Sequence, residues 1–145
     1  DWKNGEHPYI RQFENYIGIL LGYQPESCEQ RGICGIQNVV EADGSVYPCD
    51  FYMLDEYRLG NFNANQMEEI NAKRKEIGFI ERSLQLKESC KSCPYFTICR
   101  GGCQRNRDYD QVSGMYENYF CKSYEMFFDA CLPKMKEMAE TLKRR

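Results

Sequence analysis

Residues 89–107 read SCKSCPYFTICRGGCQRNR, so that four cysteines lie within fourteen residues of a chain of 145 residues. Five more cysteines lie elsewhere, which makes nine. The odd number, the long cysteine-free stretches with helical patterning and the lack of a secretory signal argue against a secreted disulfide scaffold. Thiolates are soft ligands for zinc ions and for iron–sulfur clusters, and four of them complete either kind of site. The stretch therefore predicts metal binding.

A predicted β-hairpin groups two of the other cysteines. Residues 36–41 and 45–47 are rich in β-forming side chains and flank the turn signal ADG. Cys34 comes just before the first run and Cys49 just after the second. Because an antiparallel hairpin brings its open ends together, we expect these two thiols to be neighbours.

The late cysteines follow the pattern C-x2-C-x5-C-x3-C. This pattern loosely resembles the ferredoxin run, whose fourth cysteine binds the other of two clusters. The same logic allows Cys103 to join the early group and Cys121 to complete the late group. Cys131 lies on the apolar stripe of a predicted helix, where a small buried hydrophobic residue is sufficient explanation. The single histidine, His7, is far from the run, so mixed cysteine–histidine zinc sites are not expected.

Helical patterning surrounds the cysteine-rich region. Residues 8–21 and 123–145 carry apolar stripes at helical spacing, and Pro133 either kinks the second helix or starts another. A polar helix is predicted over residues 66–78, with an asparagine at its start: Asn63 or Asn65. The fold class is therefore a small α+β fold in which a β-hairpin and cysteine-rich loops bind two metal clusters and helices flank both ends.

Charge and hydropathy exclude some partners. The formal net charge of −3 gives no reason to expect nucleic acid. No apolar run approaches the roughly 20 residues that span a bilayer, so we expect no membrane and a cytoplasmic location. Several basic residues lie beside cluster ligands and would offset their charge, although each by itself is more simply explained as facing solvent. They are Lys91, Arg100, Arg105, Arg107 and Lys122.

The full set of cysteine intervals resembles a known family. The spacing C-x5-C-x14-C, the late run and then C-x17-C is similar to the SPASM domain, the auxiliary-cluster domain of radical S-adenosylmethionine enzymes. The closest resemblance is to anaerobic sulfatase-maturating enzymes. Besides Cys28, the matching pieces are CGIQNVVEADGSVYPCDFYM, LGNF, SCKSCPYFTICRGGCQRNR and NYFCKSY, within residues 28–124.

This resemblance implies two 4Fe–4S clusters. The implied ligands of the first are Cys28, Cys34, Cys49 and Cys103, and those of the second are Cys90, Cys93, Cys99 and Cys121. It also implies three parts: a helical segment over residues 1–27 that is the tail of a missing radical domain, the SPASM domain over 28–124, and a C-terminal helix over 125–145.

The resemblance further implies oxidation of a cysteine or serine of a sulfatase polypeptide to formylglycine. Asp50 matches the family aspartate that takes up a substrate proton, and an external protein donates or accepts electrons. The radical-generating motif C-x3-C-x2-C is not in this chain. S-adenosylmethionine and a third 4Fe–4S cluster would therefore be bound by the missing domain, and we expect this chain alone to be inactive.

Two other functions stay open at this point. One is a protein-binding module stapled by two four-thiolate zinc sites. The other is the SPASM domain of a maturase that modifies a ribosomal peptide. In material prepared in air, we expect the clusters to be lost and the sites to hold zinc, disulfides or no metal, because exposed thiolates oxidise and exchange metals.

Overall fold

The structure is a computed structural model that describes residues 4–6 and 8–144, so His7 lies outside the described residues. The helices are α1 (Arg11–Leu20), α2 (Cys28–Arg31), α3 (Met67–Glu76), α4 (Phe79–Arg82), α5 (Glu88–Lys91), α6 (Phe96–Cys99) and α7 (Cys121–Lys143), with short 3-10 helices η2 (Asp50–Tyr52), η3 (Asp55–Tyr57) and η4 (Gln104–Asn106). The strands are β1 (Val39–Val40), β2 (Ser45–Tyr47), β3 (Gly60–Asn61), β4 (Arg107–Asp110) and β5 (Met115–Asn118).

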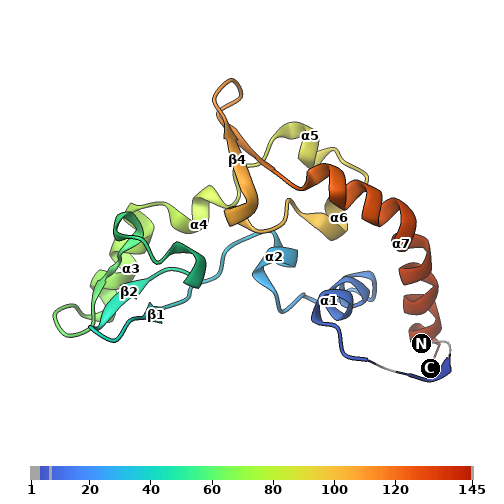
Figure 1. The fold of residues 1–145 in the computed structure, drawn as a ribbon, viewed down its shortest axis with the longest axis horizontal. Coiled ribbons are helices and arrows are strands. Elements are labelled where there is room, and N and C mark those ends of the chain that lie inside the picture. Colours follow the sequence, from blue (N-terminus) through green and yellow to red (C-terminus); the bar gives the residue numbers. More distant parts are fainter. Residues whose placement is uncertain (1–3, 7, 145) are drawn as a thin grey trace.

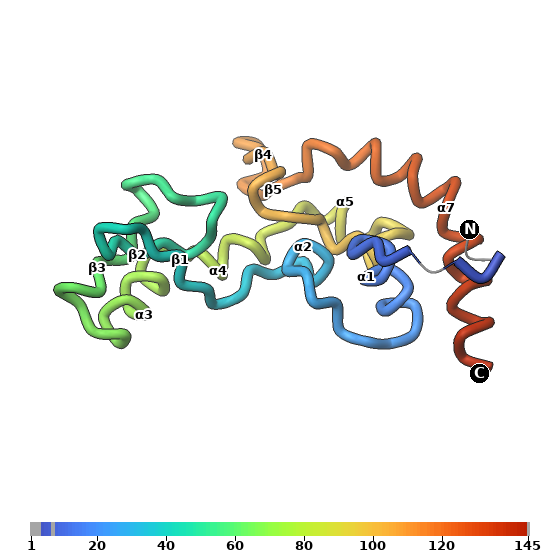
Figure 2. The backbone as a smooth tube through the Cα atoms, turned by 60° about the horizontal axis from the view of Figure 1, so that its bottom comes forward, coloured from blue at the N-terminus to red at the C-terminus, as the bar shows by residue number. Residues whose placement is uncertain are grey.

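The molecule is elongated, and its two ends differ in structure (Figure 1). One end holds the sheet β1–β2–β3 together with α3, and the other holds α1 and α7. α2 and α4 lie between these ends, as a second view also shows (Figure 2), whereas α6 packs against α1 and α7. The expected α+β class, with a hairpin flanked by helices, is confirmed.

The predicted hairpin forms, with a shorter first strand than expected. β1 pairs antiparallel with β2, and Val40 faces Val46 across the pair. The turn is held by Asp43, whose carboxylate accepts hydrogen bonds from the backbone N–H and the hydroxyl of Ser45, at 2.9 and 2.8 Å. Val46 is buried with Ile70 of α3, so the helix covers this end of the sheet.

The polar helix also forms, but the predicted asparagine caps are wrong. α3 begins after Gln66, whose backbone N–H donates to the Glu69 carboxylate at 2.8 Å. Asn65 instead accepts a hydrogen bond from the backbone of Asn61, and Asn63 donates to the carbonyl of Asp43. Both asparagines tie turns of the sheet together rather than starting the helix.

The flanking helices pack on each other. Tyr16 of α1 meets Phe128 of α7 edge-on, with ring centroids 5.3 Å apart, and both side chains are buried. α7 is one helix with Pro133 inside it, and it bends along its length (Figure 2). A proline removes one backbone hydrogen bond and crowds the preceding turn, which explains the bend. The helix begins at Cys121 rather than at residue 125, so a predicted ligand lies on its first turn.

A second hairpin, β4–β5, was not predicted. Its residues pair from Arg107 with Asn118 to Asp110 with Met115. The sequence lacks apolar alternation here because most of the side chains are polar. Lys87 crosses to it and forms ion pairs with Asp110 at 3.1 Å and with Glu117 at 2.7 Å.

Within the described residues, the apolar core is divided into two clusters. The larger lies between α1, α6 and α7, and the smaller consists of Val46, Leu59 and Ile70 at the sheet. The late cysteine run contacts the larger cluster through Tyr95, Ile98 and Cys99. Among the described helices, none has the length and apolar character needed to cross a membrane.

Candidate metal centres

One cavity of about 690 Å³ brings together four cysteines from distant parts of the chain. Cys28 is the first residue of α2, and Cys34 follows that helix. Cys49 comes after β2, and Cys103 comes directly before η4. The hairpin thus places Cys34 and Cys49 on the same cavity, as its geometry predicts.

The other four predicted ligands line a second, smaller cavity of about 100 Å³. Cys90 lies in α5, Cys93 follows it, and Cys99 ends α6. Cys121 enters from the first turn of α7. None of the nine cysteines, all of which are described, forms a disulfide.

A tight turn separates the two sets within the late run. Cys99 and Cys103 line different cavities although only three residues lie between them. Gly101 and Gly102 have φ angles of 79° and 62°, in the left-handed region where a side chain is strained. A Cβ on Gly102 would come within 2.5 Å of the Asn118 amide nitrogen. The two glycines therefore let the chain cross from one cavity to the other.

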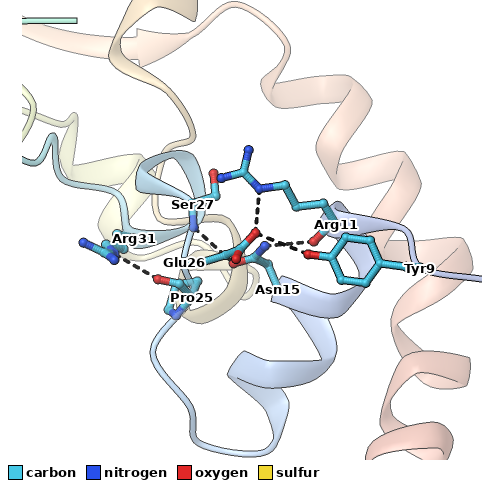
Figure 3. Close-up of polar contacts among 7 residues, drawn as sticks. All are labelled: Tyr9, Arg11, Asn15, Pro25, Glu26, Ser27 and Arg31. Atoms are coloured by element: carbon cyan, nitrogen blue, oxygen red, sulfur yellow. Dashed lines mark hydrogen bonds and ion pairs between the residues drawn. The ribbon is translucent and has the colours of Figure 1, made fainter. Parts of the chain in front are cut away.

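The first cavity is anchored to α1 by a polar network (Figure 3). The carboxylate of Glu26 accepts a hydrogen bond from Nε of Arg11 at 2.6 Å. The buried side chain of Asn15 accepts from the backbone N–H of Ser27 at 3.2 Å and donates to the carbonyl of Arg11 at 2.8 Å. These contacts position the start of α2 and therefore Cys28.

Arg107 joins the two cavities from within the protein. Its side chain is only 8% exposed, so the expectation that it faces solvent is wrong. Its guanidinium donates to the carbonyls of Gly101, Gly102 and Ser83, at 3.0, 2.7 and 2.6 Å. The hydroxyl of Ser83 in turn accepts from the backbone N–H of Cys34 at 3.0 Å. One buried arginine therefore fixes the glycine turn and the loop that carries Cys34.

The electrostatics of Arg107 reflect both cysteine sets. Burial lowers its pKa, and negative charge on nearby cysteines, which is present once their thiols ionise, opposes that shift. These thiols come from both cavities: Cys34 and Cys103 from the first, Cys90 and Cys99 from the second. A positive charge buried between two groups of thiolates would stabilise their ionised form.

Burial keeps most of the predicted ligands protonated in the absence of metal. It raises the pKa of Cys34 to about 11, of Cys49 to about 12 and of Cys99 to about 11. Burial also raises the pKa of Cys90 and of Cys103. Because only a thiolate is a metal ligand, metal binding at these positions must release protons.

Asp50 lies at the first cavity, at the start of η2. It is exposed, and its carboxylate accepts a hydrogen bond from the Cys49 thiol at 3.2 Å. A cysteine that binds metal carries no proton, so this hydrogen bond cannot persist beside a bound cluster. The carboxylate would then be free to face a reactant in the cavity.

The remaining basic residues near the ligands are at the surface, as expected, except that Arg100 is only partly exposed. Lys122 pairs with Glu125 at 2.8 Å, and Arg105 lies over the ring of Phe51 with 4.4 Å from guanidinium carbon to ring centroid. Cys131 is half-buried on α7 and packs against the α1–α7 core, away from both sets.

The donor set fits a multi-iron cluster. Four thiols line each cavity, and four cysteines are the usual ligand set of a 4Fe–4S cluster. Within residues 4–6 and 8–144, no three cysteine, histidine or acidic side chains are grouped closely enough for a single metal ion. A cluster spaces its thiolates more widely than one ion does, because each thiolate binds a different iron.

Comparison with known proteins gives a family match. Residues 33–94 match the family model SPASM, described as an iron–sulfur cluster-binding domain. A cysteine-type anaerobic sulfatase-maturating enzyme from Clostridium perfringens is 42% identical over 143 residues, which cover 99% of this chain and 39% of that enzyme. A serine-type anaerobic sulfatase-maturating enzyme from Bacteroides thetaiotaomicron is 32% identical over 138 residues, which cover 92% of this chain and 33% of that enzyme.

The fold of this chain also matches a solved protein structure. The structure described as native anSMEcpe with bound AdoMet and Kp18Cys peptide has 42% sequence identity and a TM-score of 0.87. The match covers 97% of this chain and 39% of that chain. This chain therefore spans about two fifths of the length of the Clostridium perfringens enzyme and of this solved chain.

Proposed function

We propose that this chain is a SPASM domain, the auxiliary-cluster domain of an enzyme that oxidises a cysteine or serine of a sulfatase to formylglycine. The match of residues 33–94 to the SPASM model and the similarity to anaerobic sulfatase-maturating enzymes support this proposal. The observation that carries this proposal is the pair of cavities, each lined by four thiols from separate segments.

Each cavity would hold one 4Fe–4S cluster. The ligands of the first are Cys28, Cys34, Cys49 and Cys103, and those of the second are Cys90, Cys93, Cys99 and Cys121. The cluster-binding unit would span residues 28–124, with residues 1–27 and 125–145 as flanking helical parts. Support for this unit comes from the family match over residues 33–94 and from the ligands on both sides of it.

The proposed reaction requires an acceptor for one electron and an acceptor for one proton. An aldehyde is two electrons more oxidised than the corresponding alcohol. A thiol oxidised by two electrons gives a thioaldehyde, which water converts to the aldehyde with release of hydrogen sulfide. In both cases a radical that abstracts a hydrogen atom removes one of the two electrons. When bound, the clusters supply an acceptor for the second electron. Asp50 would take the proton from the substrate side chain, since it lies exposed on the cavity beside Cys49.

The radical itself would come from elsewhere in the enzyme. The chain has no C-x3-C-x2-C motif, so S-adenosylmethionine and its cluster would be bound by a part outside this chain. By itself the chain would bind clusters and have no turnover. Its substrate would be a sulfatase polypeptide, consistent with the relatives named as cysteine-type and serine-type maturating enzymes.

Anaerobic reconstitution tests the cluster assignment. We expect about eight irons and about eight sulfides per chain, with a Mössbauer spectrum typical of 4Fe–4S clusters. Cys103→Ser should lose about half of the iron, whereas the control Cys131→Ser should lose none. Stoichiometric zinc that iron cannot replace would instead support a zinc-stapled binding module.

Asp50→Asn tests the proton acceptor in the complete enzyme. We expect turnover to fall by about 10² to 10⁴, the usual range for a lost general base. Iron content should stay unchanged, because Asp50 is not among the thiol ligands. Asp55→Asn, which removes another exposed acid nearby in the chain, is the control. Normal turnover of Asp50→Asn would show that a different group takes the proton.

A further inference from the structure

A third cavity, of about 570 Å³, lies outside both cysteine-lined cavities. Its lining combines cations with large apolar side chains, and among the described residues no acidic one lines it. We call this cavity the basic groove. Its lining residues are Arg31, Gly32, Ile33, Leu84, Leu86, Lys91, Phe96, Thr97 and Arg100.

The basic groove lies where the loops of the two ligand sets touch. Gly32 lies between Cys28 and Cys34 of the first set, and Arg100 directly follows Cys99 of the second. A Cβ on Gly32 would come within 2.5 Å of the Arg100 Cβ, so the two backbones are in close contact. A molecule in the groove would therefore lie against both ligand-bearing loops.

Arg100 has a backbone conformation that an arginine rarely adopts. Its φ and ψ are 50° and 26°, and among the described residues it is the one non-glycine with positive φ. Glycine would take this conformation without steric strain. Strained residues of this kind cluster at functional sites. Here the strained residue places a guanidinium on the groove.

The groove's cations keep most of their charge available. Nε of Arg31 donates to the carbonyl of Pro25 at 2.9 Å (Figure 3). Nε of Arg100 donates to the carbonyl of Thr97 at 3.2 Å. These carbonyls are neutral, so neither contact cancels a positive charge. Lys91 pairs with Glu88 at 3.3 Å, in a solvent-exposed contact that adds little.

The apolar part of the groove is accessible. Leu84 is 56% exposed and Ile33 is 36% exposed, while Leu86 below them is buried. Accessible apolar side chains bordered by charged ones have the composition of a protein-binding surface. The positive charge of the residues that border the groove favours an acidic partner.

We propose that the basic groove docks a small acidic protein that carries a one-electron redox group. This inference rests on the proposed function, in which an electron must leave the domain after each oxidation. The exchange moves one electron from the domain to the oxidised carrier, which is thereby reduced, and it makes or breaks no bond. The chain is otherwise acidic, with a net charge of −3, so the groove would determine how such a carrier is oriented.

Binding of a carrier tests the docking site independently of turnover. The cluster-loaded protein is titrated by calorimetry with an oxidised, acidic 2Fe–2S ferredoxin as the probe. For Lys91→Glu combined with Arg100→Gly, we expect binding at least about tenfold weaker at low salt. The difference should shrink as salt is raised, because ions screen exposed charges. The glycine suits the backbone at position 100, so the fold should be retained.

A charge-matched control separates the groove from overall charge. Lys75→Glu combined with Lys136→Gln changes the net charge by the same amount at exposed positions of α3 and α7. Full binding by this control together with weak binding by the groove variant supports the docking site. Equal loss in both variants, or no binding by the unaltered protein, overturns it.

Two further measurements distinguish the inference from its premise. Iron and sulfide content are measured in each variant. Absence of iron from the unaltered protein would contradict the proposed function. Full iron content together with unchanged ferredoxin binding in the variant with Lys91→Glu and Arg100→Gly would contradict only the docking site. A photo-crosslinking benzoylphenylalanine in place of Leu84 identifies the occupant of the groove. A crosslink to ferredoxin supports the inference, and one confined to another part of the same protein or to a second copy contradicts it.

Discussion

At the scale of single residues, Arg107 links two sites that lie on different segments. Its guanidinium donates to carbonyls of the glycine turn and of Ser83 from a position 8% exposed. A buried guanidinium must have hydrogen-bond partners, and buried carbonyls must have donors. The arginine satisfies both needs at the one turn through which the chain passes between the cavities.

Arg107→Met should therefore destabilise the protein strongly. The substitution leaves buried carbonyls without donors, and hydrogen bonds to a charged group contribute about 1.5–3 kcal/mol each, so we expect a loss of about 3 kcal/mol or more. The measurement is urea unfolding of the cluster-loaded protein. Arg105→Met is the control, since it removes an exposed arginine two residues away. Similar unfolding midpoints for both variants would contradict this role of Arg107.

The buried thiols predict how stability depends on pH without metal. Burial raises the pKa of Cys34 and Cys99 to about 11 and of Cys49 to about 12, from an ordinary value of 9.0. A raised pKa in the folded state means that the folded protein resists ionisation more than the unfolded chain does. The contribution of these protonated thiols to the free energy of unfolding is therefore complete below pH 9, and it is lost as the pH rises towards 11 to 12.

We therefore expect the metal-free protein to lose stability progressively above pH 9. The cluster-loaded protein should not follow this profile, because its ligands are already ionised. Thermal unfolding of both forms between pH 7 and 11 is the measurement. A flat profile for the metal-free form would show that these thiols are not buried as described.

At the scale of elements, the β4–β5 hairpin is held by polar contacts at its turn. The Asp110 carboxylate accepts hydrogen bonds from the backbone N–H of Val112 at 2.9 Å and from the hydroxyl of Ser113 at 3.0 Å. With Lys87, these contacts lower its pKa to about 2. The hairpin matters to the site because β4 begins with Arg107 and β5 ends with Asn118, which donates to the carbonyl of Gly101 at 3.0 Å.

Asp110→Asn should loosen this hairpin and lower the unfolding temperature by a few degrees at neutral pH. The reason is that the charged acceptor of the turn and the partner of Lys87 are lost together. Asp108→Asn, at an exposed position of the same strand, is the control and should have little effect. Amide exchange at Glu117 and Asn118 would report whether the loosening reaches β5.

At the scale of the whole molecule, stability depends on what joins the two ends. The described residues form one apolar cluster at α1, α6 and α7 and a smaller one at the sheet, and Cys99 of the second cysteine set packs against the larger cluster. Neither cluster extends through the middle. Two four-thiolate clusters would tie together segments from Cys28 to Cys121 and so act as structural centres as well as electron acceptors.

Removal of iron should therefore uncouple the two ends. We expect chelation to abolish amide-exchange protection first in the cysteine-rich loops, while Met135 and Ile70 at the two apolar clusters keep more of theirs. Unfolding should also become less cooperative. Hydrogen exchange of loaded and metal-free protein is the measurement. Uniform loss of protection along the chain would show that the two ends do not behave as separate units.

Much of the fold was predictable from local pattern. The ADG turn between β-rich runs predicted the hairpin, and apolar spacing predicted α1 and α7, because both patterns depend on residues close in sequence. The caps of α3 and the β4–β5 hairpin were missed. Gln66 and Glu69 form an uncommon capping pair, and residues 107–118 lack the apolar alternation that marks a strand.

The sequence by itself determined the ligand type and intervals: eight cysteines at spacings that resemble one family, which predicts two four-thiolate sites. Only the tertiary structure decided that Arg107 is buried beside thiols of both sets, and that Arg31 and Arg100 line one groove. The physical reason is that burial and proximity between distant segments arise from packing and hydrogen bonding in three dimensions, whereas sequence pattern records only local periodicity and spacing.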